Sequence, residues 1–94
     1  MPTYQPSPEF LELHRRLTPE QKRLFRAAVR KFVADLKAGQ GFRKGLRVKG
    51  IKGAEGMFEM TWAPDGRAVF SYGKSIRDND PHIVWHAIGT HGVL

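Results

Sequence analysis

The chain has 94 residues, enough for one domain and too few for a large second one, so we expect residues 1–94 to form a single domain. Its hydrophobic content of 40% and charged content of 27% are typical of a folded soluble protein. It has no cysteine, which excludes disulfides, thiolate zinc sites and a cysteine nucleophile. No apolar run approaches the roughly 20 residues of a membrane span, and no signal-peptide pattern opens the chain. We therefore expect a cytoplasmic protein with no membrane partner.

The positive charge is concentrated in the first half of the chain. Lys and Arg number 16 against 9 Asp and Glu, a net charge of +7. Residues 1–52 hold thirteen of the basic and four of the acidic residues, whereas residues 53–94 hold three and five. A basic half of this kind favours a polyanionic partner such as a nucleic acid or an acidic protein.

Two helices are predicted after a proline-rich opening. The opening residues 1–6 contain two prolines and are predicted to be extended, as a short edge strand. A first helix is predicted over residues 7–17, with Ser7 as its N-cap. A second is predicted over residues 18–39, with a Thr18–Gln21 capping box and Gly39 as its stop. The wide apolar stripe of this helix indicates that it packs on another layer of the protein. The stripe consists of Leu24, Phe25, Ala28, Val29, Phe32, Val33 and Leu36.

The rest of the chain reads as strands. These are predicted over residues 46–53, 56–63, 67–73 and 82–88, with a type I turn over residues 64–66 that places Gly66 in the left-handed conformation. Two helices followed by a run of strands predict an α+β fold. We expect two N-terminal helices packed on one face of a twisted, mainly antiparallel sheet of about four strands.

Side-chain alternation assigns the two faces of this sheet. The turn places Trp62 opposite Ala68 and Met60 opposite Phe70, and opposed residues share a face. The predicted core face is Phe58, Met60, Trp62, Ala68, Phe70 and Tyr72, with Leu46, Val48, Ile83, Trp85 and Ala87 from the flanking strands. The other face then collects Arg47, Lys49, Glu59, Thr61, Arg67, Ser71, His82, Val84, His86 and Ile88.

The polar face has the residue types that bind phosphate. Arg binds it by paired hydrogen bonds and Lys as a point charge, and the neighbouring loops add further cations. The predicted phosphate-binding set is Arg43, Lys44, Arg47, Lys49 and Lys52. RNA cleavage also requires a base for the 2′-hydroxyl, stabilisation of charge at phosphorus and an acid for the 5′-oxygen. Arg67 suits the second task, Glu59 or a histidine the first, and His86 or His91 the third.

Each of these residues also has a structural interpretation. Arg67 follows a turn and can pair with Asp65 or Glu59, and Glu59 suits a cross-strand ion pair. Four scattered histidines without paired carboxylates do not predict a metal site, and we expect no cofactor.

These motifs resemble the RelE/ParE superfamily of toxins from type II toxin–antitoxin modules, with RelE-, YoeB- and HigB-like members. After a helix pair, LRVKGIKG stands where the family has its basic strand. GMFEMTWAPDGRAVFSYG resembles the family hairpin, and IGTHGVL resembles its closing segment.

The resemblance implies a metal-independent, ribosome-dependent messenger RNA endoribonuclease that is neutralised by a cognate antitoxin. It matches Arg67 to the hairpin arginine at the scissile phosphate, and Lys49 and Lys52 to basic residues before it. It makes His91 the preferred acid and His86 the second choice. Two alternatives stay open: a ParE-like inhibitor of DNA gyrase that cuts no RNA, and a non-toxic basic nucleic-acid-binding module.

Overall fold

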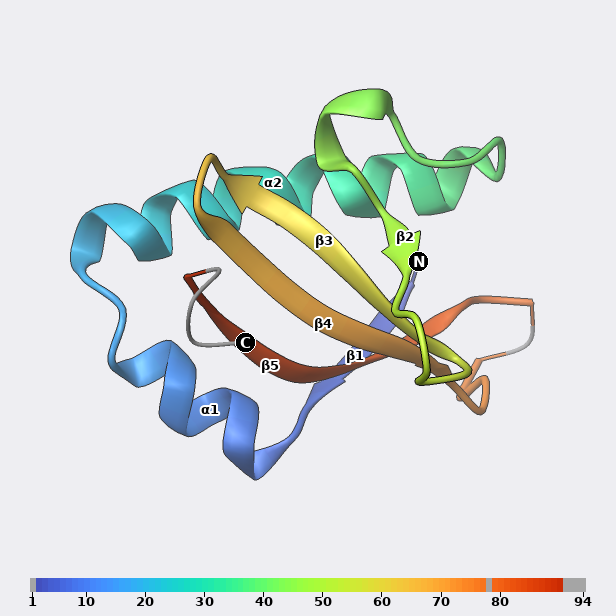
Figure 1. Ribbon diagram of the computed structural model, residues 1–94. Coiled ribbons are helices and arrows are strands. Elements are labelled where there is room, and N and C mark those ends of the chain that lie inside the picture. Colours follow the sequence, from blue (N-terminus) through green and yellow to red (C-terminus); the bar gives the residue numbers. More distant parts are fainter. Residues whose placement is uncertain (1, 78, 91–94) are drawn as a thin grey trace.

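Residues 2–77 and 79–90, which the computed structural model describes, form two α-helices, one short 3-10 helix and five strands (Figure 1). In chain order these are β1 (Thr3–Pro6), α1 (Pro8–Arg15), α2 (Pro19–Ala38), η1 (Lys44–Leu46), β2 (Lys49–Gly50), β3 (Met57–Ala63), β4 (Gly66–Gly73) and β5 (His82–Thr90). The predicted α+β class is confirmed.

The five strands form one twisted sheet in the order β1-β5-β4-β3-β2. All neighbours are antiparallel except β1, which runs parallel to β5 at the edge and lies beside it in Figure 1. Backbone hydrogen bonds hold β1 at both ends, from the N–H of Thr3 to the carbonyl of Pro81 at 3.0 Å and from the N–H of Ser7 to that of Trp85 at 2.9 Å. The proline-rich opening is thus the expected edge strand, and it raises the strand count from about four to five.

Both helices begin as their capping residues predict. The hydroxyl of Ser7 accepts the N–H of Phe10 at 3.0 Å. The capping box at α2 is complete, with bonds of 3.1 and 2.9 Å between Thr18 and Gln21. Gly39 ends α2 with a left-handed φ of 69°. Neither described helix is long and apolar enough to cross a membrane.

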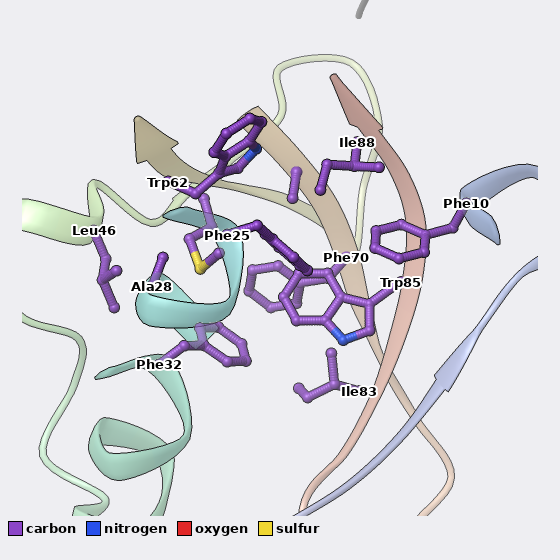
Figure 2. Packing of buried hydrophobic residues seen from close by; sticks show 12 residues of the cluster. Phe10, Phe25, Ala28, Phe32, Leu46, Trp62, Phe70, Ile83, Trp85 and Ile88 are labelled. Carbon is purple, nitrogen blue, oxygen red and sulfur yellow. The ribbon is translucent and has the colours of Figure 1, made fainter. Parts of the chain in front are cut away.

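The core lies between the helices and one face of the sheet, which we call the inner face. The ring of Trp85 on β5 contacts Phe10 of α1 and Phe25 and Phe32 of α2, with centroids 5.9, 5.5 and 5.4 Å apart. Both helices therefore cover the same face of the sheet. Figure 2 shows these rings converging with Phe70 in the centre of the cluster. Phe32, which is fully buried, comes from the middle of the predicted apolar stripe.

The β3–β4 hairpin has the predicted faces but a different turn. Met60 lies opposite Ala68, two residues from the predicted register, and a shift of two keeps every side chain on its face. Gly66 pairs with Ala63 and is not among the described residues with positive φ, so its predicted left-handed conformation is wrong. A Cβ at Gly66 would lie 2.5 Å from the indole ring of Trp62. Glycine is needed here because Trp62, the extra residue of a bulge in β3, packs against the backbone.

A second bulge changes the faces of β5. Val69 pairs with Ala87 and Phe70 with Trp85, so His86 is the extra residue. Beyond it the alternation shifts by one: Ile88 is fully buried opposite Ala68, and Ala87 joins the other face. The predicted positions of Ala87 and Ile88 are therefore reversed, because a bulge adds a residue that strict alternation does not count.

The predicted basic strand over residues 46–53 is mostly a turn. Only Lys49 and Gly50 pair with β3. Before them the chain forms η1, and Arg47 closes it in a left-handed conformation, φ 47°, with its N–H bonded to the carbonyl of Lys44 at 3.1 Å. Leu46 is buried as predicted. The turn lets Leu46 reach the core, and it takes Arg47 out of the sheet.

Candidate active site

The face of the sheet opposite the helices, which we call the outer face, carries the polar residues that the sequence predicted there except Arg47, which lies outside the sheet. Its central positions are Lys49, Glu59, Thr61, Arg67, Val69, Ser71, Val84, His86 and Ala87. The register arranges them in rows across the strands. Thr61 and Arg67 form one row, Glu59, Val69 and Ala87 the next, and Met57, Ser71 and Val84 the third. Successive rows are roughly 7 Å apart, as alternate residues of a strand must be.

Glu59 lies between two cations. Its Oε1 atom is 3.5 Å from the Nζ of Lys49 and 4.0 Å from the Nε of Arg67. Lys49 and Glu59 are direct partners across β2 and β3. Glu59 thus makes the cross-strand ion pair that the sequence allowed, and its carboxylate lies close to the cationic groups of both Lys49 and Arg67.

Arg67 is held in place by the turn that precedes it. Its Nη1 atom donates to the carbonyl oxygen of Gly66 at 2.9 Å and makes longer contacts of 3.4 Å with those of Ala63 and Pro64. The side chain is only 16% exposed. Within the described residues the Nη2 atom has no hydrogen-bond partner, so its N–H groups remain available to an anion. A guanidinium fixed on one side and open on the other is suited to bind phosphate.

Ser71 and His86 form a hydrogen-bonded pair on the same face. The Oγ of Ser71 lies 2.7 Å from the Nε2 of His86. The His86 side chain lies on this face, as alternation predicted, and the carbonyl of His86 accepts the hydroxyl of Ser7 at 3.2 Å. The imidazole is thus oriented by a side chain of β4, and its backbone is tied to the start of α1. The sequence pattern placed Ser71 and His86 on one face, but it did not show that they pair.

The other predicted phosphate-binding residues are spread around the loops. Arg43 donates two side-chain hydrogen bonds of 2.9 Å to Asp35 at the end of α2. These bonds hold the pKa of Asp35 below its usual range and identify Arg43 as a loop anchor. Lys44, Arg47 and Lys52 are exposed, and Arg47 lies off the sheet beside α2 and the hairpin turn.

Two further histidines were considered from the sequence, His82 and His91. His82 lies at the β1 end of the outer face, is 5% exposed, and bonds through Nδ1 to the hydroxyl of Thr3 at 2.8 Å, so its role there is structural. His91, the preferred acid, lies outside the described residues. Among the described residues no group of three or more His, Asp or Glu side chains is arranged to hold a metal ion.

Tyr72 is on the inner face as predicted, although 49% exposed, and its ring contacts Phe58 and Phe70.

The fold has clear counterparts among solved structures. No family model matches the sequence, and no curated protein matches it. YafQ in the Escherichia coli DinJ–YafQ toxin–antitoxin complex superimposes with a TM-score of 0.66 at 14% identity, over 99% of this chain and 96% of that one. A copper-bound mutant toxin from Helicobacter pylori superimposes with a TM-score of 0.64 at 15% identity, over 100% of this chain and 99% of that one. The RelB–RelE antitoxin–toxin complex from Methanococcus jannaschii gives 0.61 at 8% identity, over 94% and 91%.

These likenesses cover nearly the whole of both chains. Identities of 8 to 15% carry information on the fold and not on individual residues. The resemblance to the RelE/ParE superfamily that the sequence suggested is confirmed at the level of the fold: this chain has the architecture of the RelE and YafQ toxins.

Proposed function

We propose that the protein is the toxin of a type II toxin–antitoxin pair and a metal-independent endoribonuclease that cuts messenger RNA, in the cytoplasm and on the ribosome. The observation that carries the proposal is the composition of the outer face. An anchored arginine and an acid between two cations occupy successive rows of one sheet face, and a histidine from the bulge is hydrogen-bonded to Ser71 of the third row.

The spacing of the rows suits a single phosphate between Arg67 and His86. The row between them presents Val69 and the small Ala87, with Glu59 at its end. A phosphodiester above these two residues would have Arg67 on one side and His86 on the other, each about one row away. The Nη2 atom of Arg67 and the imidazole of His86 are the groups that would contact it.

In the proposed reaction a base removes the proton of the ribose 2′-hydroxyl, which attacks the neighbouring phosphorus. Arg67 stabilises the additional negative charge on the phosphate oxygens. An acid protonates the departing 5′-oxygen, leaving a 2′,3′-cyclic phosphate and a 5′-hydroxyl. Glu59 or a histidine serves as the base, and His91 or His86 as the acid. Lys49 binds the flanking phosphates together with the exposed Lys44 and Lys52 of the loops.

A cognate antitoxin is the proposed protein partner. YafQ and RelE were each crystallised with one, DinJ and RelB respectively. The strongly basic first half of the chain suits a partner with acidic surfaces.

The test is induced expression with mapping of RNA 5′-ends. Wild type, Arg67→Ala and Arg67→Gln are compared with Arg30→Ala, which removes an exposed arginine of α2 remote from the outer face. Gln keeps a donor for the turn carbonyls, so it separates loss of charge from loss of the fold. We expect arrest and new messenger cuts with wild type and Arg30→Ala, and neither with the two Arg67 variants.

Other outcomes point elsewhere. Growth arrest with intact messenger would reject the ribonuclease and favour a gyrase inhibitor of the ParE kind. Messenger cuts that persist in both Arg67 variants would support the ribonuclease activity but reject the proposed role of Arg67 in it. Normal growth of cells that contain folded wild-type protein would reject a toxin and favour a non-toxic basic nucleic-acid-binding module.

A further inference from the structure

A basic hollow lies beside the outer face, next to the turn between β3 and β4. It has a volume of about 510 Å³ and is enclosed by α2, η1 and the β3–β4 turn. Four cations line it: Lys31 of α2, Arg43 and Arg47 at the ends of η1, and Arg67 of β4. The other described lining residues are uncharged. We call this hollow the turn pocket.

Two of the four cations of the turn pocket, Lys31 and Arg47, have no ion pair within the described residues. Arg43 is engaged by Asp35 at 2.9 Å. Lys31 and Arg47 have no ion pair or side-chain hydrogen bond within the described part of the chain, and both are exposed. Arg67 has Glu59 only at 4.0 Å. Like charges gathered around one hollow repel one another, so an anion that enters it relieves this repulsion.

The position of Arg47 supports a binding role. Its φ of 47° places it in the left-handed region, which residues other than Gly and Asn seldom adopt. Glycine would suit this position better, and glycines are frequent nearby, at Gly41 and Gly45. The arginine keeps a strained conformation at the mouth of a basic hollow, as residues at binding sites often do.

The edge of β3 leaves the turn pocket open. The short strand β2 pairs only with Phe58 and Glu59, so in the described chain Thr61–Ala63 have a strand neighbour on one side only, β4. Thr61 and Ala63 line the pocket there, opposite α2. Arg67 belongs both to the pocket and to the outer face, so the two sites are continuous around the turn.

We infer that the turn pocket is a second phosphodiester-binding site, which holds the backbone of single-stranded RNA next to the segment on the outer face. Lys31, Arg47 and the free side of Arg67 are its ligands. This inference rests on the proposed function, because Arg67 orients the RNA through both sites. An acidic peptide offers the same charge, but RNA is favoured because a chain of regularly spaced phosphates can occupy two adjoining cationic sites at once.

The experiment measures binding separately from cleavage. The probe is a 2′-O-methyl RNA oligonucleotide, which has no 2′-hydroxyl to attack phosphorus and so cannot be cut. The pocket variant combines Lys31→Ala with Arg47→Gly, since glycine accepts the left-handed φ. The control combines Arg30→Ala with Lys37→Ala, which removes two exposed charges of α2 that do not line the turn pocket. Circular dichroism of all three proteins confirms folding.

We expect the pocket variant to bind the oligonucleotide about tenfold more weakly than wild type. The slope of log K against log salt concentration should fall by about 1.4, since each lost contact to a single strand accounts for about 0.7. The control should change both quantities much less. Equal losses in the pocket variant and the control, or no RNA binding by wild type, would overturn the inference.

A poly-glutamate peptide serves as the second probe. If it binds wild type more tightly than the RNA does, and only its binding depends on Lys31 and Arg47, the pocket is a protein-binding site and the inference is wrong. Because the RNA probe cannot be cleaved, a protein that binds it through the pocket but cuts no messenger would contradict the proposed function and not the pocket.

Discussion

The two faces of the sheet differ in what holds their side chains. On the inner face, rings from α1, α2 and three strands contact one another, and Phe32, Phe70, Met60 and Ile88 are fully buried. On the outer face the contacts are individual polar ones: Glu59 with Lys49 and Arg67, and Ser71 with His86. One face is stabilised by many non-directional contacts, and the other positions a few charged groups by direction and distance.

This difference predicts a separation of stability from activity. Truncation of an aromatic side chain removes burial and leaves a cavity, whereas loss of a half-exposed polar contact costs much less. Inner-face variants should therefore change the free energy of unfolding, and outer-face variants should change RNA cleavage in a protein that remains folded.

Phe32→Ala should have the largest effect. The ring of Phe32 is fully buried between Phe42, Phe70 and Trp85, with centroids 4.8, 4.9 and 5.4 Å away. We expect a loss of about 3–5 kcal/mol in the free energy of unfolding, measured by urea denaturation. A loss below about 1 kcal/mol, the size typical of a surface change, would contradict the central place of this ring.

Gly66→Ala tests the contact between the hairpin backbone and Trp62. The added methyl group would lie 2.5 Å from the indole, so the ring or the turn must shift. We expect a loss of about 1–3 kcal/mol and a change in tryptophan fluorescence. Gly45→Ala is the matched control: its Cβ meets nothing within 4 Å and its φ is not positive, so its stability should be nearly unchanged. Similar losses in both variants would reject the packing explanation.

Ser71→Ala should separate the two faces most sharply. Removing the hydroxyl breaks one partly buried hydrogen bond, so we expect a loss of about 1 kcal/mol in stability. The rate of RNA cleavage should fall, since the imidazole of His86 loses the group that orients it. Ser71→Thr keeps the hydroxyl and should restore the rate. An unchanged cleavage rate in Ser71→Ala would make the pair a structural contact only.

The smallest effect should come from protonation of His14 on α1. Burial lowers its pKa, and Lys22 and Arg26 of α2 lower it further. The unfolded chain therefore binds this proton more tightly than the folded one, and the free energy of unfolding should fall as pH drops through the ordinary histidine value of 6.5. The difference in this slope between wild type and His14→Phe, measured by denaturation at several pH values, isolates the contribution of His14. If the free energy of unfolding changed with pH in the same way in both proteins, His14 would make no contribution and the prediction would be wrong.

The residues that were predicted correctly depend on short-range patterns. Ser7, Thr18, Gln21 and Gly39 act within one helical turn of their own position, so capping sets the start of both helices and the end of α2. The faces of β3 and β4 follow from alternation around one tight turn, which places Glu59, Arg67 and Ser71 on the outer face. The fold class and the position of these three residues on the outer face could therefore be predicted from the sequence.

The residues that were predicted incorrectly depend on packing between distant segments. The bulge at His86 allows Ile88 to enter the core and turns Ala87 outward. Gly66 is required by the ring of Trp62 and not by its own φ. Arg47 leaves the sheet because η1 brings Leu46 into contact with the core, and this also creates the turn pocket.

Both helices, their N-caps and the strands β1, β3, β4 and β5 could thus be predicted from periodicity and local hydrogen bonding. The turn at η1, the bulges and the hollow that Lys31 shares with Arg47 and Arg67 became visible only in the folded protein. A bulge or a turn of this kind depends on how side chains from remote segments fill the same space, which a local sequence pattern does not contain.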